Sequence, residues 1–243
     1  MSSNIIKTNL IYKKYQGIDS PFGYGEVMQS GYVDTASLLK EYRKYLIKNN
    51  LLSAETFEHD QLIVRSDLIT YKGKNYKNVI FAEGFGIHAN PFFSQLPLDG
   101  TKGELLIIKA PGLDLDVIIK SSVFVLPLGN DLFKVGATYN WEDKTATPTE
   151  HGKQELITNL QSILSIDFEI IEHLAGVRPT VKDRRPMLGT HPKYNNLHVL
   201  NGLGTRGVML APAMAKVLFE HIEHKIPLEK EIDIKRFKKI TWD

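Results

Sequence analysis

One segment near the C-terminal end constrains the fold more than any other: LHVLNGLGTRGVMLAPAMAKVLFEHIE, residues 197–223. Its apolar start predicts a strand that ends at Gly202, and its apolar spacing predicts a helix over about 208–223. Gly204 and Gly207 complete the spacing G-x-G-x-x-G. Such a junction lets the backbone approach a ligand closely, and a helix N-terminus offers unpaired N–H groups. A plain glycine-rich turn has the same composition, and spacing alone does not separate the two interpretations.

This spacing does not belong to a complete dinucleotide-binding unit. Such a unit continues into a second parallel strand, about 20 residues further on, that carries an acidic residue for the ribose. Here the helix is followed by KIPLEKEIDIKRFKKITWD, whose last part we expect to be a basic, surface-exposed tail. The glycines are therefore expected to face an anion or an electron-rich carbonyl, and not the ADP half of a dinucleotide.

Composition narrows the class of protein. Hydrophobic residues make up 42% and charged residues 24%, which is typical of a globular protein. With 30 basic and 28 acidic residues, the charge is too balanced to indicate nucleic acid as the main partner. There are no cysteines, which excludes disulfides, a cysteine nucleophile and flavin attached through cysteine. No stretch resembles a secretory signal or a membrane span, so we expect a cytoplasmic protein without membrane contact.

The eight histidines form no convincing set of metal ligands, so no metal site is predicted. His221 and His224 stand three apart on the last predicted helix, where we expect them to mark its polar face.

Hydrophobic periodicity predicts two further helices. The first spans about 31–50 and is capped by Asp34 or Thr35. We expect its apolar stripe to pack on a sheet: Leu38, Leu39, Tyr42, Tyr45 and Leu46. The second spans about 149–165 with Thr149 as its cap. Its inward side chains are predicted to be Leu156, Leu160, Ile163 and Leu164.

Several strands are predicted between and after these helices. LIVRSDLITY and YKNVIFAEG look like two strands around a glycine-containing turn, with the run Val79–Ala82 buried on both faces before Gly84. GELLIIK (103–109) is a further strand, and VIIKSSVFVLPLG and LFKVGATYNW form a hairpin around Gly129-Asn130-Asp131. DFEIIEHLAGV predicts a short strand, followed by a loop rich in charge and proline. Because helices and strands do not alternate regularly, the fold class is α+β (mixed α/β) with many antiparallel pairs.

The segment 174–189, LAGVRPTVKDRRPMLG, contains the other candidate functional residue. Arg178 stands at a predicted strand end, and a guanidinium holds a carboxylate through two parallel hydrogen bonds. An arginine in such a place also serves as an ordinary ion-pair residue. Lys182, Arg184 and Arg185 lie in a polar loop and are expected to be solvated.

Together these segments resemble a known family. The first part of the pattern is G-[LV]-R-P, a polar loop and P-x-[IL]-G, and it is matched by AGVRPTVKDRRPMLGTHP. After a short spacer, the second part is a strand followed by G-x-x-x-R-[NG]-G-[IV]-x-x-A-P, and it is matched by LHVLNGLGTRGVMLAPAMA. That pattern is the C-terminal signature of the D-amino-acid oxidase/glycine oxidase (DAO) family of FAD-dependent oxidoreductases. GYVDTASLL, and NVIFAEGFG with LPLDGTKGELLII, also resemble family motifs. The resemblance covers about residues 20–225.

The resemblance implies a two-domain fold in which the domains alternate along the chain. Residues 1–30 and 88–173 would form a substrate domain built on an antiparallel sheet. Residues 31–87 and 174–243 would form a partial, Rossmann-like FAD-binding domain. The implied reaction is oxidative deamination, in which hydride leaves the carbon that bears the amine and water hydrolyses the resulting imine.

The resemblance also implies roles for individual residues. Arg178 would clamp the substrate carboxylate, and Arg206 would line the same cavity or the flavin edge. Phe124 stands where glycine oxidases have a substrate-binding tyrosine, and Tyr139 on the neighbouring strand would supply a hydroxyl instead. A bulkier amino acid or a secondary amine is therefore expected as readily as glycine. The FAD-binding residues would be Gly84, Gly202, Gly204, Thr205, Arg206, Gly207 and Val208.

One expected part of the family pattern is missing from the sequence. The family opens with a strand, G-x-G-x-x-G, a helix and a strand that ends in an acid, and nothing in MSSNIIKTNLIYKKYQGIDSPFGYGE resembles this unit. We therefore expect a fragment that begins inside the substrate domain and binds FAD weakly. Two alternatives stay open: the oxidase domain of tRNA methylaminomethyl-uridine modification enzymes, and a non-catalytic chain or subunit that needs a partner to bind FAD. We also expect the chain to aggregate or to form a homo-oligomer such as a dimer unless a partner covers the gap.

Overall fold

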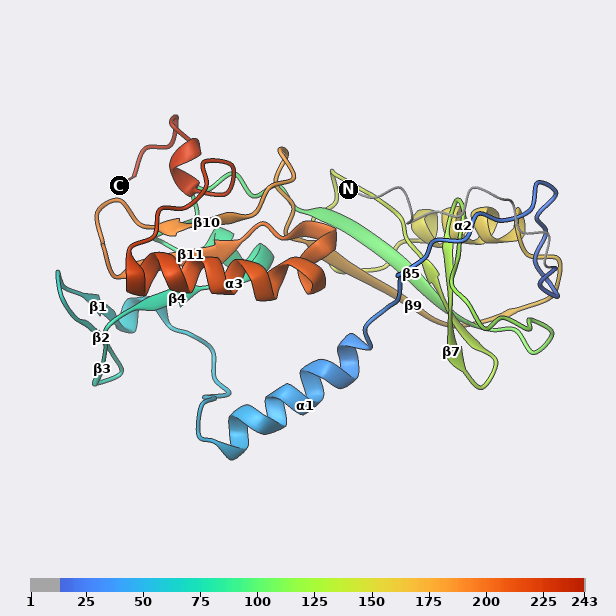
Figure 1. Cartoon of the computed structure of the whole chain (residues 1–243), viewed down its shortest axis with the longest axis horizontal. Helices are drawn as coiled ribbons and strands as arrows, with labels where there is room; N and C mark the ends of the chain where they lie inside the picture. Colours follow the sequence, from blue (N-terminus) through green and yellow to red (C-terminus); the bar gives the residue numbers. More distant parts are fainter. Residues whose placement is uncertain (1–13, 243) are drawn as a thin grey trace. The chain divides into compact units, whose positions relative to one another are not determined.

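The structure is a computed structural model that describes residues 14–242, and its chain forms two compact units (Figure 1). Of the described residues, unit 1 comprises 14–32 and Thr101–Val177, and unit 2 comprises Val33–Gly100 and 178–242. The domains expected from the sequence have boundaries after residues 30, 87 and 173, whereas the two units divide after Tyr32, Gly100 and Val177. The roles of substrate domain and FAD-binding domain remain proposals, because the residue ranges of the units do not show what each unit binds.

Unit 1 is built on a five-stranded sheet with the order β6-β7-β8-β5-β9. Its two long strands lie side by side in Figure 1. The strands are β5 (Thr101–Lys109), β6 (Ile119–Lys120), β7 (Phe124–Gly129), β8 (Leu132–Gly136) and β9 (Glu169–Arg178). The hairpin β7–β8 confirms the predicted turn: Asn130 and Asp131 both have positive φ, at 53° and 59°, as the twist of a two-residue hairpin requires.

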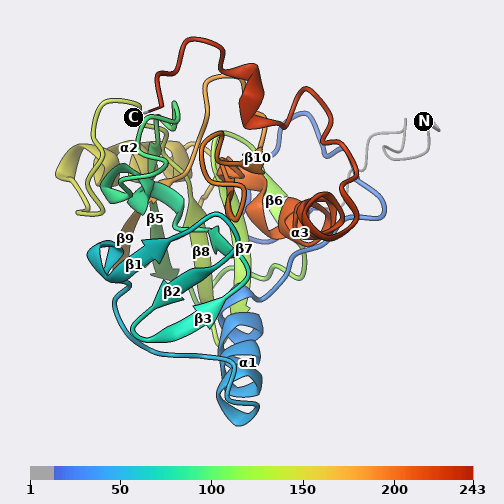
Figure 2. The ribbon, with the colours of Figure 1, turned by 90° about the vertical axis from the view of Figure 1, so that its left-hand side faces the viewer.

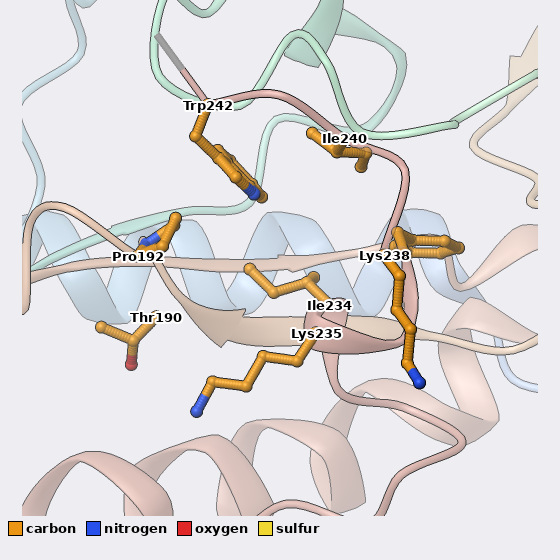
Figure 3. A pocket seen from close by; sticks show the side chains of 8 residues that line it. Thr190, Pro192, Ile234, Lys235, Lys238, Ile240 and Trp242 are labelled. Atoms are coloured by element: carbon orange, nitrogen blue, oxygen red, sulfur yellow. The ribbon is translucent and has the colours of Figure 1, made fainter.

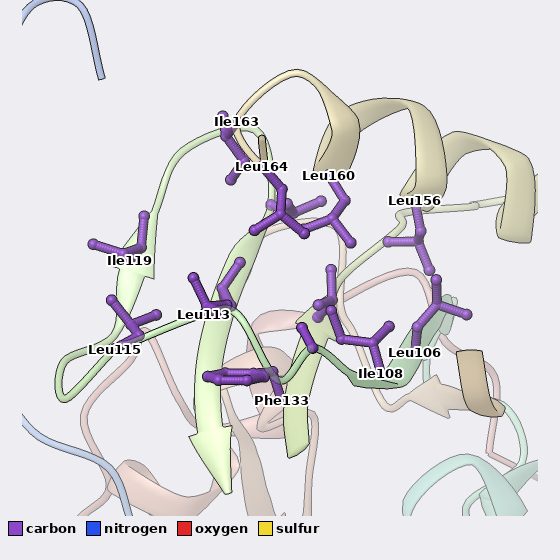
Figure 4. Packing of buried hydrophobic residues seen from close by; sticks show 14 residues of the cluster. Leu106, Ile108, Leu113, Leu115, Ile119, Phe133, Leu156, Leu160, Ile163 and Leu164 are labelled. Carbon is purple, nitrogen blue, oxygen red and sulfur yellow. The ribbon is translucent and has the colours of Figure 1, made fainter. Parts of the chain in front are cut away.

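A helix closes the core of unit 1. Helix α2 (Glu150–Gln161) begins at the predicted cap, where the Thr149 hydroxyl accepts a hydrogen bond from Gly152 N. Its inward leucines pack against the buried face of β5 (Figure 4). The core includes all four residues predicted for this helix: Leu156, Leu160, Ile163 and Leu164. Burying one such side chain contributes roughly 1.5–3 kcal/mol, so this apolar face suffices to anchor the helix.

Unit 2 contains a three-stranded sheet with the order β10-β11-β4. Its strands are β4 (Val79–Phe81), β10 (Met187–Thr190) and β11 (Leu197–Asn201); β11 runs parallel to β4 and antiparallel to β10. Helix α3 (Gly207–His224) packs on this sheet through Leu218 and Ile222. The sequence prediction placed β10 in a loop, because its four residues lie beside a charged, proline-rich stretch.

The predicted burial of the run Val79–Ala82 is wrong. Strand β4 lies at an edge of the sheet, and only Phe81 is buried, whereas Ile80 is half-exposed and Ala82 is exposed. The strand that is buried on both faces is its neighbour, β11, in which Leu197 and Val199 enter one core. A short apolar run therefore indicated a strand but not its place in the sheet.

The segment before β4 forms a three-stranded antiparallel meander (Figure 2), where the sequence predicted one strand, LIVRSDLITY, and a turn. Its strands are β1 (Leu62–Val64), β2 (Ile69–Tyr71) and β3 (Lys74–Tyr76). The turn between β2 and β3 uses Lys72 and Gly73, both at positive φ. Ser66 and Asp67 separate β1 from β2, so LIVRSDLITY is two strands and not one.

Helix α1 (Thr35–Lys48) confirms the predicted cap but contradicts the predicted packing. The Asp34 carboxylate accepts a hydrogen bond from Ser37 N at 3.1 Å. None of the helix residues is buried. The four most exposed residues of the predicted stripe are 53–67% exposed: Leu38, Leu39, Tyr42 and Tyr45. The amphipathic pattern thus predicted the helix but not its exposure, since the apolar stripe of α1 is not buried among the described residues.

The basic tail is not simply surface-exposed, as the sequence predicted. Ile234 in the short helix η4 (Ile234–Arg236) is buried, and three later apolar side chains pack against the same core: Phe237, Ile240 and Trp242. Figure 3 shows several of these side chains around a hollow of about 220 Å³. The lysines of the tail stay exposed, as predicted. Among residues 14–242, no helix has both the length and the apolar character of a bilayer span.

Candidate functional site

Three segments that are distant in the sequence meet where strands of unit 2 end. The buried Asn201, the last residue of β11, donates its side-chain N–H to Gly84 O at 2.9 Å, at the start of helix η2 (Gly84–Ala89). Gly204 N donates to Pro179 O at 3.0 Å, directly after the end of β9. These bonds bring together the motifs that contain Gly84, Arg178 and the predicted glycine-rich junction.

Gly202 shows why the junction needs glycine. Its φ is +70°, a conformation that side-chain-bearing residues rarely adopt, and a Cβ would lie 2.8 Å from Val181 Cγ2. Gly84 and Gly204 also have positive φ. Gly207 differs, because it is helical and a Cβ would meet only Leu203 at an ordinary 3.6 Å. The fold therefore explains the first glycine of the spacing but not the last.

No side chain of the described residues caps the N-terminus of α3. The short helix η3 (Gly204–Arg206) leads directly into α3, and the N-cap residue Arg206 makes no side-chain capping bond. The first N–H groups of a helix have no partner within it and carry a partial positive charge. Thr205 and Val208 are exposed beside this end.

The two candidate arginines flank one backbone hydrogen bond. Arg178 is the last residue of β9 and precedes Pro179; Arg206 follows Gly204 by two residues. Arg178 is half-buried and its carbonyl accepts the Thr180 hydroxyl, whereas Arg206 is exposed and donates to Arg184 O at 3.3 Å. Both arginines therefore lie near the glycine-rich junction.

The polar loop between β9 and β10 is exposed as predicted, at Lys182, Arg184 and Arg185. Its one acid, Asp183, binds the guanidinium of Arg236 at 2.9 Å. Burial alone raises the pKa of the Asp183 carboxyl, but the hydrogen bonds from Arg236 and from Arg185 N outweigh burial and lower it. The carboxylate therefore holds the loop against the C-terminal segment.

Tyr139 belongs to unit 1. It follows β8 and does not lie within that strand, which ends at Gly136, so its predicted place on the strand is wrong. Its side chain is 59% exposed. Phe124, at the position where a tyrosine was considered, pairs with Gly136, and a Cβ on that glycine would lie 3.0 Å from the Phe124 ring. Phe124 thus fills the space that Gly136 leaves.

Sequence reasoning missed Asn201 as a residue that shapes the site. Its side chain bridges two glycines, because it also accepts a hydrogen bond from Gly202 N at 2.8 Å. The available signal was an amide at the end of an apolar strand, directly before a glycine. No three His, Cys, Asp or Glu residues within 14–242 are grouped as a metal site would need.

Residues 13–221 match the DAO family, described as FAD dependent oxidoreductase. The chain belongs to this family. Glycine oxidase from Bacillus subtilis (strain 168) is 24% identical over 231 residues, which are 88% of this chain and 62% of that protein. The tRNA 5-methylaminomethyl-2-thiouridine biosynthesis bifunctional protein MnmC from Azoarcus sp. (strain BH72) is 27% identical over 175 residues, which are 63% of this chain and 28% of that protein.

Solved structures agree on the fold of this DAO family member. Glycine oxidase from Geobacillus kaustophilus matches with a TM-score of 0.56 at 23% identity, over 68% of this chain and 48% of that one. Iminodiacetate oxidase from Chelativorans sp. BNC1 matches with a TM-score of 0.57 at 22% identity, over 71% and 51%. The chain thus spans about half the length of these structures, and the α+β class predicted from the sequence is confirmed.

FAD is the cofactor of this family. Two features of the glycine-rich junction bear on whether one end of this cofactor would fit there. A side chain at position 202 would clash with Val181, so only glycine fits there, and no side chain in the described part of the chain caps the N-terminus of α3. The first N–H groups of a helix have no partner within it. These features suit the electron-rich pyrimidine end of a flavin. Gly204, Thr205, Arg206, Gly207 and Val208 would hold that end, with Gly84 beside them. This fit concerns one end of the cofactor and does not extend to the ADP half.

Proposed function

We propose that this chain supplies the substrate carboxylate clamp and the flavin-facing helix terminus for FAD-dependent oxidation of an amino acid or a related amine. One observation carries the proposal: Arg178 and the uncapped N-terminus of α3 lie on either side of the Gly204–Pro179 hydrogen bond. A cation for the substrate and a positive helix terminus for the flavin are therefore held by the same backbone contact.

The residues would act mainly by orientation and electrostatics. Arg178 would hold the substrate carboxylate through its planar fork, which directs the carbon that bears the amine. FAD, when bound, supplies the hydride acceptor for that carbon. The N–H groups at the start of α3, with Arg206, would stabilise negative charge that develops beside them. Loss of hydride from carbon and a proton from nitrogen leaves an imine, which water hydrolyses to a carbonyl product and an amine or ammonia.

A spectral assay tests this function. The purified chain is mixed with FAD, and amino acids and secondary amines are added without oxygen. We expect loss of the oxidised flavin absorbance with substrates that carry both an amine and a carboxylate. The proposed reaction would be contradicted if the chain holds FAD at a saturating concentration but none of these amino acids and amines reduces the flavin.

A second candidate function has a specific observation in its favour. Lys182, Arg184, Arg185 and Arg206 are all exposed. Such a group of cations suits a substrate that carries phosphates, as RNA does. This favours an oxidase that acts on an amine attached to RNA. Salt-dependent binding of a tRNA, lost in the double variant Arg184→Ser/Arg185→Ser, would support this candidate over a free amino acid.

A further inference from the structure

Unit 2 contains a hollow of about 220 Å³ that none of the residues proposed to bind substrate or FAD lines. It lies between the end of β10 and the C-terminal segment, and most of its lining comes from η4 and the residues after it (Figure 3). A water molecule occupies about 30 Å³ in the liquid, so the hollow has room for roughly seven water-sized groups. Its size therefore suits a small organic molecule.

The wall of the hollow is mainly apolar. Pro192 and Ile234 line it together with three side chains of the C-terminal segment: Phe237, Ile240 and Trp242. Ile234 is buried, whereas these three are only partly buried against the core. Apolar surface that stays in contact with water is unfavourable, and covering it with another apolar group releases that cost. The wall therefore favours a ligand with an apolar body.

Two lysines give the hollow its charge. Lys235 and Lys238 belong to the lining, and both residues are exposed. In Figure 3 their side chains extend away from Trp242 and Ile240, so the ammonium groups and the aromatic end of the wall lie apart. Among residues 14–242, no aspartate or glutamate is part of this lining. Cations at one end and apolar surface at the other fit a small anion that has an apolar body.

The backbone that carries the lysines is held by contacts outside the hollow. The Asp233 carboxylate caps η4 by accepting a hydrogen bond from Lys235 N at 2.9 Å. The next residue, Arg236, donates to the Asp183 carboxylate at 2.9 Å, and its guanidinium lies 4.1 Å from the centre of the Phe237 ring. Because these contacts exist without a ligand, binding needs little further ordering of the segment.

The aromatic end of the wall is held against the core in the same way. The Trp242 ring lies 4.9 Å from the His191 ring and 6.1 Å from the Phe93 ring, edge to face in both pairs. His191 and Phe93 are buried. Burial, followed by the charge of Lys193, lowers the pKa of His191, so the imidazole behind the indole is uncharged at neutral pH. The charge at the hollow therefore comes from the two lysines that line it.

We propose that this hollow is a binding site for a small organic anion with an apolar body, separate from the Arg178 site. Lys235 and Lys238 bind the anionic group, and Trp242 with the neighbouring apolar side chains covers the body. An ion pair at an exposed site is weak by itself, and apolar contact by itself does not select a charged ligand. Recognition therefore requires both parts of the hollow, which gives the proposal two independent tests.

Trp242 reports on binding directly. The chain has two tryptophans, so Trp141→Phe leaves Trp242 as the only one. In that background the full chain is titrated at constant ionic strength with cyclohexanecarboxylate, and separately with the uncharged cyclohexanecarboxamide. We expect the carboxylate to change the Trp242 emission saturably and to bind about tenfold or more tightly than the amide. No saturable change with the carboxylate, or equal affinity for the two compounds, would overturn the proposal.

Paired lysine variants locate the site. Lys235→Met/Lys238→Met removes both charges of the hollow, and Lys230→Met/Lys239→Met removes two charges from exposed residues of the same segment that do not line it. We expect the first pair to weaken carboxylate binding by about tenfold or more, and the second pair and Arg178→Met to leave it nearly unchanged. Equal weakening in both pairs would show attraction by overall charge, and loss of the signal in Arg178→Met would place the anion elsewhere; either result would refute this site.

Discussion

At the scale of single residues, the candidate site depends on whether Arg178 recognises a carboxylate. Arg178→Met preserves much of the apolar stem and removes the fork. We expect KM to rise far more for an amine that carries a carboxylate than for one that lacks it. Removing one partner of a buried charged pair costs about 2–5 kcal/mol. Steady-state kinetics on a matched pair of substrates measures the difference, and equal losses for both would refute the assignment.

His198 makes a second prediction at this scale. Its side chain is buried in β11 with Nδ1 3.0 Å from Thr190 Oγ1 and Nε2 3.2 Å from Asn78 Oδ1. Burial, followed by the charges of His221 and Lys225, lowers its pKa to about 4. The His198 imidazole therefore binds a proton more readily in the unfolded chain than in the folded chain. The stabilisation that this group contributes is fully present above pH 6.5 and is lost as the pH falls toward 4.

We expect the free energy of unfolding to fall by about 1–2 kcal/mol between pH 7 and pH 5 from this group. Urea titrations at the two pH values measure it. His198→Gln should reduce the difference by that amount, because glutamine does not titrate. Burial also lowers the pKa of His191, which adds a contribution of the same sign to both proteins. An identical pH dependence in the variant would show that His198 does not contribute.

At the scale of elements, α3 connects the candidate site to the core of unit 2. Leu218 is 1% exposed and packs with Leu188, whereas the Lys216 side chain, two residues earlier, is 76% exposed. We expect Leu218→Asp to cost more than about 3 kcal/mol and to prevent soluble expression, because it removes apolar contacts and buries a charge. Lys216→Asp should be tolerated. Equal soluble yields of the two variants would mean that the helix is peripheral.

At the scale of the whole molecule, we expect the 243-residue chain by itself to bind FAD weakly. Its glycine-rich junction fits the flavin end, and the sequence shows no strand with an acidic residue after it for the ribose. Fluorescence titration with FAD measures this affinity. Stoichiometric, submicromolar binding would contradict the expectation.

The same chain is expected to self-associate unless a partner covers its apolar surface. In unit 2, β4 is an edge strand, and several apolar side chains are exposed, among them Leu39, Ile80, Met209 and Phe219. Light scattering over a range of protein concentrations tests this. A single monomeric species at every concentration would show that these side chains do not drive association.

The sequence by itself determined the local features of this protein. The caps Asp34 and Thr149, the Asn130-Asp131 turn and the glycine-rich junction depend on backbone preferences of a few neighbouring residues, and all were predicted. The motifs also indicated the family, because each places particular residue types at a fixed spacing.

Only the tertiary structure decided which partners these local elements meet. It placed β4 at a sheet edge, left α1 exposed, and made strand β10 from a segment predicted as a loop. It also joined Asn201 to Gly84 and Lys102 to Asp143, across 117 and 41 positions of the chain. Such contacts depend on which distant surfaces meet, and hydrophobic periodicity records only that a residue is apolar, not what covers it.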